Sequence, residues 1–194
     1  MAIPISIEKL LSGGVVESSR IEYKEGWNPD AIYRSICAFA NDFDNIGGGY
    51  IVVGVEEKNG RAVRPVKGID INKIEPIEKD MIGFNNLIKP FYYPKTSIEE
   101  IDGKKVFVIW AHGGLNRPYE VPECVTAKEK KHKLFIRYNS SSIEAKGDLR
   151  TELFDLTARI PFDDMPNQDA KLSDISRTRV FDYLNKIGSK LTEE

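Results

Sequence analysis

The sequence contains few cysteine and few histidine residues, two of each among 194. Cys37 and Cys124 lie far apart, and neither is near a second ligand at zinc-site spacing from His112 or His132. Two cysteines are also too few for a disulfide scaffold. We therefore expect no zinc site and two free thiols, as is usual in the reducing cytoplasm.

Long hydrophobic runs are absent. The longest uncharged apolar stretch, residues 50–55, is far shorter than the roughly 20 residues that a membrane-spanning helix needs. The first residues, Met1 to Ile5, lack the basic segment and apolar stretch that mark a signal peptide. We therefore expect a cytoplasmic protein with no membrane partner.

Three common catalytic or nucleotide-binding motifs are also missing. No G-x-x-x-x-G-K-[ST] sequence is present, which excludes a Walker-type phosphate loop. The glycines at 47–49 come before an expected strand, whereas the glycines of a dinucleotide fingerprint follow a strand and open a helix. His112-Gly113-Gly114 resembles part of an oxyanion loop, but no G-x-S-x-G accompanies it, so serine hydrolase chemistry is not indicated.

Hydrophobic periodicity predicts helices interleaved with hairpins. Asn28 is placed to cap a helix that begins at Pro29 and buries one face through Ile32, Ile36 and Phe39. Asn59-Gly60 and Asp102-Gly103 are hairpin turn signals. This order favours an α+β fold, with a mixed or antiparallel sheet of hairpins packed by several helices. The other helices are expected at 6–11, 71–88, 148–159 and 173–191, and the strands at 20–24, 50–55, 62–66, 96–101, 105–110 and 133–138.

A group of small and polar residues follows the helix that begins at Pro29. Asn41 ends the helix and could cap its carbonyls or brace the next turn, while Gly48 and Gly49 allow the backbone to turn into the buried strand. Gly54 lies near the end of that strand. We interpret these four residues as structural.

Carboxylates gather around the first expected strand. Glu22 and Lys24 are two positions apart and therefore share a face of the sheet. Glu17 precedes the strand, and Glu56 emerges at the end of the next one. With Lys24 beside them, these acids could hold Mg²⁺ or Mn²⁺ for phosphodiester cleavage, with Glu17 and Glu22 as metal ligands. The alternative is the solvated side of an ordinary edge strand.

The net charge of −2 hides a basic segment. Residues 127–150 carry seven basic and three acidic side chains, a net charge of +4. Such a local positive field attracts phosphate backbones, although lysines also gather at solvated hairpin tips. Arg137 and the serines after it could bind phosphate, or could form a plain polar loop. The candidate phosphate contacts are Lys128, Lys130, Lys131, Lys133, Arg137, Ser140, Ser141 and Ser142.

Four segments, taken in order, resemble a known family. They are Glu17-x4-Glu22-x-Lys24, Ala38-Phe39-Ala40-Asn41, Gly48-Gly49-Tyr50-Ile51-Val52-Val53-Gly54-Val55, and Phe135-Ile136-Arg137-Tyr138-Asn139-Ser140-Ser141-Ser142 with the following Ala145. Over roughly residues 10–160 the chain resembles the Schlafen-type, Alba-like DNA-binding domain. That domain forms the N-terminal part of bacterial and archaeal transcriptional regulators associated with a divergent AAA domain.

The resemblance implies an α+β fold and nucleic-acid binding. In the eukaryotic Schlafen branch it also implies a metal-dependent RNA-cleaving site made from two glutamates and an aspartate. Glu17 and Glu22 match the glutamates, and Glu56-Glu57 stand where the aspartate would be sought. The family pairs two such lobes in Schlafen proteins, whereas this sequence contains one.

We therefore expect residues 1–160 to form a domain that binds DNA or RNA, with DNA favoured, as part of a dimeric regulator rather than an enzyme. Residues 161–194 would be a linker and helix leading to a C-terminal region outside this sequence, where any ATP-binding activity of the family would lie. Two alternatives remain open: a Mg²⁺- or Mn²⁺-dependent endoribonuclease-like site, and a protein-interaction module in which the last helix docks or self-associates.

Overall fold

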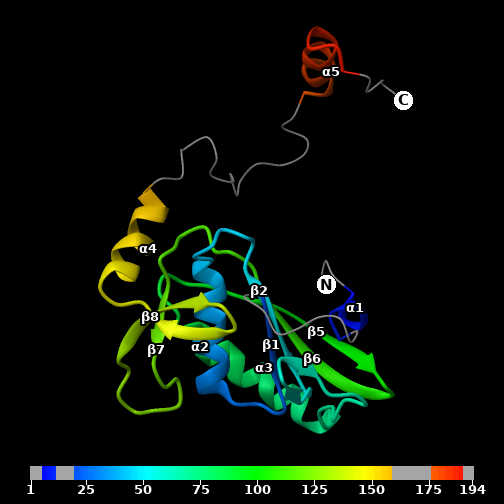
Figure 1. Cartoon of the computed structure of the whole chain (residues 1–194), viewed down its shortest axis with the longest axis vertical. Coiled ribbons are helices and arrows are strands. Elements are labelled where there is room, and N and C mark those ends of the chain that lie inside the picture. Colours follow the sequence, from blue (N-terminus) through cyan, green and yellow to red (C-terminus); the bar gives the residue numbers. More distant parts are fainter. Residues whose placement is uncertain (1–5, 12–19, 159–175, 190–194) are drawn as a thin grey trace. The chain divides into compact units, whose positions relative to one another are not determined.

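The computed structural model describes residues 6–11, 20–158 and 176–189 (Figure 1). The chain divides into two compact units, residues 1–160 and 161–194. The first combines helices with mixed and antiparallel sheets, which confirms the predicted α+β class. Its elements are α1 (Ile7–Leu11), β1 (Ile21–Lys24), α2 (Pro29–Asn41), β2 (Gly49–Val53), β3 (Glu57–Lys58), β4 (Arg61–Ala62), α3 (Ile71–Asn85), β5 (Lys95–Ile101), β6 (Lys104–Ala111), β7 (Glu120–Pro122), β8 (His132–Tyr138), β9 (Ser141–Glu144) and α4 (Asp148–Ala158).

The main sheet has four strands in the order β1-β2-β6-β5. β1 and β2 are parallel, and the other two pairings are antiparallel. Every residue of β2 is buried, as the continuous apolar run predicts, because helices cover both faces of the sheet. Ile51 and Val53 pack on the side of α2 and α3, while Tyr50 and Val52 pack on the side of α1.

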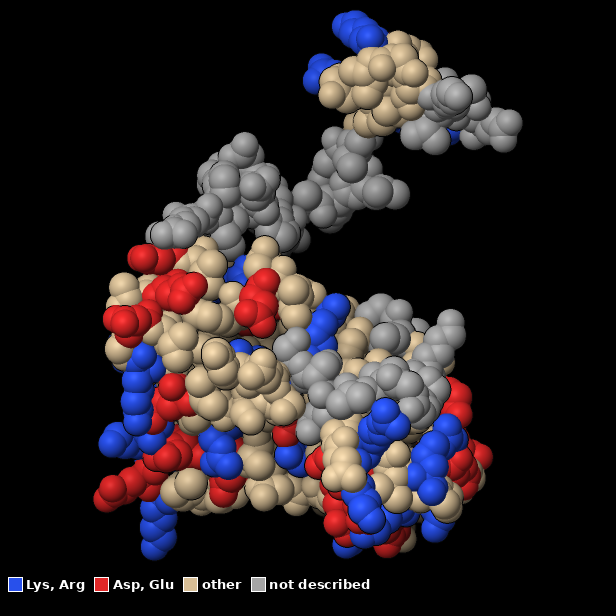
Figure 2. Space-filling model, in the orientation of Figure 1, with Lys and Arg blue, Asp and Glu red and all other residues tan. Residues whose placement is uncertain are grey.

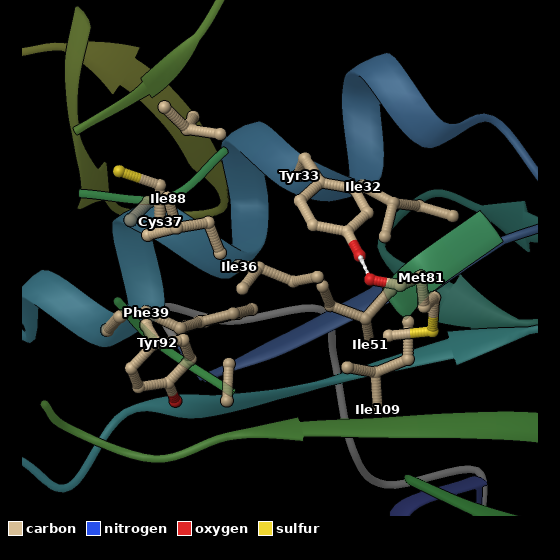
Figure 3. Packing of buried hydrophobic residues seen from close by; sticks show 14 of the residues in the cluster. Ile32, Tyr33, Ile36, Cys37, Phe39, Ile51, Met81, Ile88, Tyr92 and Ile109 are labelled. Carbon is tan, nitrogen blue, oxygen red and sulfur yellow. Dashed lines mark hydrogen bonds between the residues drawn. The ribbon is translucent and has the colours of Figure 1, made fainter. Parts of the chain in front are cut away.

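Helix α2 lies between the main sheet and a second antiparallel sheet of β7, β8 and β9 (Figure 1). Asn28 caps it, with Oδ1 accepting a hydrogen bond from the Ala31 N–H at 3.2 Å, as predicted. The expectation that α2 buries one face is too narrow, because packing against two sheets also buries Tyr33 and Ser35. The phenol of Tyr33 reaches across to α3 and donates to the Met81 carbonyl at 3.2 Å (Figure 3).

The two cysteines have opposite environments. Cys37 is fully buried in α2 and Cys124 is exposed, and both are free thiols. Burial raises the pKa of the Cys37 thiol to about 12, and the thiol donates to the Tyr119 carbonyl at 3.2 Å.

A thiol-specific reagent should therefore modify only Cys124 in the folded protein and both residues in concentrated urea. Equally fast modification of Cys37 and Cys124 without denaturant would contradict this packing.

Several elements differ from the sequence-based expectation. The expected strand 62–66 is reduced to β4, because Pro65 has no N–H for a sheet ladder and the Val66 N–H donates to the Asp102 carboxylate instead. The helix expected over 71–88 ends at Asn85. The short strand β7 was not expected, and the serine segment begins a strand, β9, rather than forming only a turn.

The second unit contains one described helix, α5 (Arg177–Lys186), shorter than the expected 173–191. Residues 173–175, 190 and 191 of that expectation lie outside the described residues. Ser176 caps α5, and no described residue of the helix is buried. Among the described residues, no helix combines the length and apolar character that crossing a membrane requires.

Candidate nucleic-acid interface

An ion pair between Glu22 of β1 and Arg137 of β8 links the two sheets beside α2. Nη1 of Arg137 lies 2.5 Å from Oε2 of Glu22. The exposed fractions of the two side chains are 4% for Arg137 and 10% for Glu22. The guanidinium also lies 4.8 Å from the centre of the Phe39 ring. Arg137 is thus an internal cation with an anionic partner, and in this position it is not placed to meet a phosphate backbone.

The register of the sheet explains why a carboxylate enters the core here. Glu22 is paired with Ile51, and side chains of paired residues point to the same face, which here is the face covered by α2. Lys24 shares that face, as predicted, with Nζ 2.5 Å from Oε1 of Glu22. A buried carboxylate is costly unless it is paired, and Arg137 and Lys24 supply the compensating charge.

The serines expected to bind phosphate separate into two environments. Ser142 Oγ accepts a hydrogen bond from Nη1 of Arg137 at 3.0 Å and donates to Oγ of Ser35 in α2 at 3.1 Å. Ser142 therefore extends the internal network. Ser140 is exposed in the turn between β8 and β9, and Ser141 is exposed as the first residue of β9.

Asn41 connects the end of α2 to the second sheet. It is fully buried, and its Nδ2 donates to the Tyr119 carbonyl at 2.9 Å and to the Phe135 carbonyl at 2.7 Å. Its Oδ1 accepts from the Tyr119 N–H at 2.6 Å. One side chain therefore satisfies three backbone groups of β8 and of the segment before β7, rather than bracing the turn that follows α2.

The glycine segment after α2 wraps around Asp42. The carboxylate of Asp42 accepts backbone hydrogen bonds from Ile46, Gly47 and Gly48 at 3.0 to 3.1 Å. Nη1 of Arg117 donates to the Asp42 carbonyl at 2.9 Å. Sequence reasoning missed Asp42 and Arg117 as a structural pair. The only signal was an aspartate placed shortly before a run of glycines, whose N–H groups can surround a carboxylate.

Glycine is required at positions 48, 49 and 54, either because a Cβ would have no space or because the backbone φ is positive. A Cβ on Gly49 would lie 2.2 Å from Cε1 of Phe39, and a Cβ on Gly48 would lie 2.2 Å from the Ala111 carbonyl oxygen. Gly54 has a φ of +101°, in the region that favours glycine. Because glycine has no Cβ, this segment can approach α2 and β6 closely.

Three exposed lysines, Lys128, Lys130 and Lys131, occupy the loop between β7 and β8, which we name the lysine loop. The ammonium group of Lys130 donates to the Val125 carbonyl within the loop. In the view of Figure 2, blue atoms in this region, at the lower left, lie among red ones. The lysine loop is thus a local group of cations on a surface of mixed charge.

Lys133, at the start of β8, is not part of this exposed group. Its Nζ lies 2.8 Å from the Glu123 carboxylate and 3.1 Å from the Glu144 carboxylate. The hydrogen bond to the Glu123 carboxylate, and to a smaller extent the one to Glu144, raises the pKa of the Lys133 ammonium. Lys146 also pairs with Glu144, at 3.1 Å, but its side chain is 73% exposed. The two acids therefore offset part of the positive charge counted in the sequence.

The lysine loop and the exposed serines lie at opposite ends of β8. The loop precedes His132 and the serine turn follows Tyr138, so a seven-residue strand separates them. At about 3.3 Å per residue, the strand places the two groups roughly 20 Å apart. At this separation the two groups cannot contact the same phosphate.

The candidate metal ligands are not gathered within the described residues. Glu22 is held by Arg137 and Lys24, and Oε2 of Glu56 lies 2.7 Å from Nζ of Lys67. No group of three His, Cys, Asp or Glu residues suited to a metal ion occurs in the described part of the chain. Glu17 lies outside the described residues. The Mg²⁺- or Mn²⁺-dependent nuclease therefore stays a prediction.

Comparison with known families places this arrangement in a defined class. The profile of the Schlafen, AlbA_2 family matches residues 17–146, which is more than half of the chain. The chain therefore belongs to the Schlafen, AlbA_2 family, and the predicted resemblance is confirmed. The matched region contains β1, the α2–glycine–β2 segment and the hairpin of β8 and β9.

Solved structures are similar to this chain at low sequence identity. The DIP2311 protein of Corynebacterium diphtheriae has the same fold, with a TM-score of 0.52 and 19% identity over 97% of this chain and 40% of that one. This chain thus spans 40% of the length of DIP2311. The N-terminal domain of a RecG-related protein of Nitrosomonas europaea is similar with a TM-score of 0.45 and 23% identity, over 70% of this chain and 87% of that one. A search among curated proteins finds no match.

Proposed function

We propose that residues 1–160 form a nucleic-acid-binding module that contacts the phosphate backbone through the lysine loop. The observation that carries the proposal is the cluster of Lys128, Lys130 and Lys131, exposed on one short loop with a single acid, Glu129, among them. Lysine side chains bind phosphates as flexible point charges and need no fixed geometry. Membership of the Schlafen, AlbA_2 family supports the same function.

The internal position of Arg137 modifies the proposed contacts. Because its guanidinium is occupied by Glu22, Ser142 and the Phe39 ring, Arg137 would support the β8–β9 hairpin rather than touch the nucleic acid. Lys146, exposed beyond the end of β9, is better placed to add a contact near the lysine loop. A preference for DNA over RNA, and a role in a transcriptional regulator, belong to the same proposal.

A triple substitution of Lys128, Lys130 and Lys131 by alanine should weaken binding and reduce its salt dependence. For every phosphate that the variant no longer neutralises, the slope of log K against log salt should become shallower by about 0.9 on duplex DNA. Fluorescence anisotropy with labelled duplex DNA, single-stranded DNA and RNA, between low and moderate salt, measures both quantities. Comparing the three ligands also decides between DNA and RNA.

The matched control removes three exposed lysines elsewhere, at positions 58, 73 and 104. This variant has the same net charge as the test variant, so a general effect of charge would weaken both equally. Equal losses would show that the lysine loop is not the contact. Absence of binding by the unmodified protein to all three ligands at low salt would contradict the proposed function.

A further inference from the structure

Strand β5 forms one edge of the main sheet, and its outer side is unpaired within the described residues. The order β1-β2-β6-β5 places β5 at the end of the main sheet, where β6 is its only partner strand among the described residues. β5 is seven residues long, and six of these are exposed or half-buried. An edge of this length presents backbone N–H and C=O groups that can pair with another strand, so proteins usually cover or shorten it.

An apolar surface continues from this edge onto α3. Ile98 of β5 is paired with Phe107, which belongs to the core under α2 and α3, so Ile98 points to the same face. On this face a shallow groove runs between α3 and the start of β5, lined by Met81, Ile82, Tyr93, Pro94, Thr96 and Glu78. Ile82, Tyr93 and Ile98 are 62%, 52% and 46% exposed. Large apolar side chains next to an open strand edge favour an interaction surface.

The charges of β5 are complementary to those of a second copy of the same strand. Lys95 lies near one end of β5 and Glu99 near the other, on one face, and neither has an ion-pair partner among the described residues. A two-fold antiparallel pairing centred on Ser97 places Lys95 of each copy opposite Glu99 of the other. Cross-strand pairs of opposite charge stabilise a sheet, and like charges placed opposite destabilise it.

We propose that two copies of this chain associate through β5, joining their main sheets edge to edge in an antiparallel pair centred on Ser97. In this arrangement Ile98 of each copy lies diagonally across from Ile98 of the other, on the side of α3. Ile82 and Tyr93 of both copies flank the junction and are withdrawn from water. The proposal does not depend on nucleic-acid binding, since the lysine loop and β5 belong to different sheets.

A charge swap tests the pairing directly. Sedimentation equilibrium of the full chain, from micromolar to several hundred micromolar, should show a monomer–dimer equilibrium. Lys95→Glu and Glu99→Lys should each raise the dissociation constant about tenfold or more, because each places two like-charged pairs at the junction. The double variant restores opposite charges and should return the constant to within about threefold of the original protein.

Lys58→Glu is the matched control, because Lys58 is exposed on β3 and carries the same change of charge as Lys95→Glu. It should leave the dissociation constant unchanged. A dimer that withstands both single charge reversals would form elsewhere, for instance through α5, and would overturn the proposal. A double variant as weak as the single ones, or a monomer over the whole concentration range, would also overturn it.

Discussion

Replacing Arg137 with alanine is expected to lower the free energy of unfolding by about 3–5 kcal/mol, the usual cost of breaking a buried ion pair. The substitution leaves the Glu22 carboxylate buried with Lys24 as its remaining ion-pair partner among the described residues, and it removes the cation beside Phe39. A small domain is stable by about 5–15 kcal/mol in total, so this decrease is a large share. Urea unfolding followed by circular dichroism measures it.

Two further variants show whether the unpaired charge causes the decrease. Replacing Glu22 with leucine and Arg137 with methionine together should recover much of the stability, because an apolar pair can replace a buried ion pair at little or no cost. Lys131→Ala, on the exposed lysine loop, should change stability by less than about 0.5 kcal/mol. An Arg137→Ala protein as stable as the Lys131→Ala protein would contradict the buried pairing.

Replacing Gly48 with alanine should cost about 2–5 kcal/mol. A Cβ at this position would lie 2.2 Å from the Ala111 carbonyl oxygen and 2.7 Å from the Gly113 backbone nitrogen. Both are backbone atoms that cannot rotate away, so the chain must shift at a cost of about 1–3 kcal/mol. The φ of +76° adds about 1–2 kcal/mol for any residue with a Cβ. Chemical denaturation compares the variant with the original protein.

Gly83 provides the matched control for this substitution. It lies inside α3, and a Cβ there would meet nothing within 4 Å. Gly83→Ala should therefore stabilise the protein by about 0.5–1 kcal/mol, because alanine loses less backbone entropy on entering a helix. Opposite signs for Gly48→Ala and Gly83→Ala would support the close approach of Gly48 to β6. A Gly48→Ala protein of unchanged stability would show that the two segments are further apart.

Local sequence patterns predicted most of the fold. The β-branched run of β2, the cap and proline of α2, and the hairpin turn at Asp102-Gly103 each act over a few residues, and the structure contains the expected elements. The prediction of a strand over residues 62–66 was wrong because the Val66 N–H donates to the carboxylate of Asp102, which lies far along the chain. A pattern of local residues carries no signal for that contact.

The candidate site was less predictable than the fold. The alternation of residues 21–24 correctly placed Glu22 and Lys24 on one face. It did not indicate that α2 covers this face, and the cation that compensates Glu22 comes from β8, more than one hundred residues later. Arg137 therefore resembled a surface residue in sequence. The lysines of residues 128–131 are exposed, but Lys133 is paired with two acids that sequence distance did not reveal.

The sequence by itself determined the α+β class, the family, the buried strand β2 and the basic segment at 127–150, because periodicity, turn residues and charge are local properties. Only the tertiary structure determined which of those charges are buried, which are paired and which are exposed. In the folded chain Arg137 is buried against Glu22, and the serines and lysines lie at opposite ends of β8. The outer edge of β5 has no partner strand among the described residues. The energy of a charge depends on its burial and on its nearest opposite charge, and folding sets both.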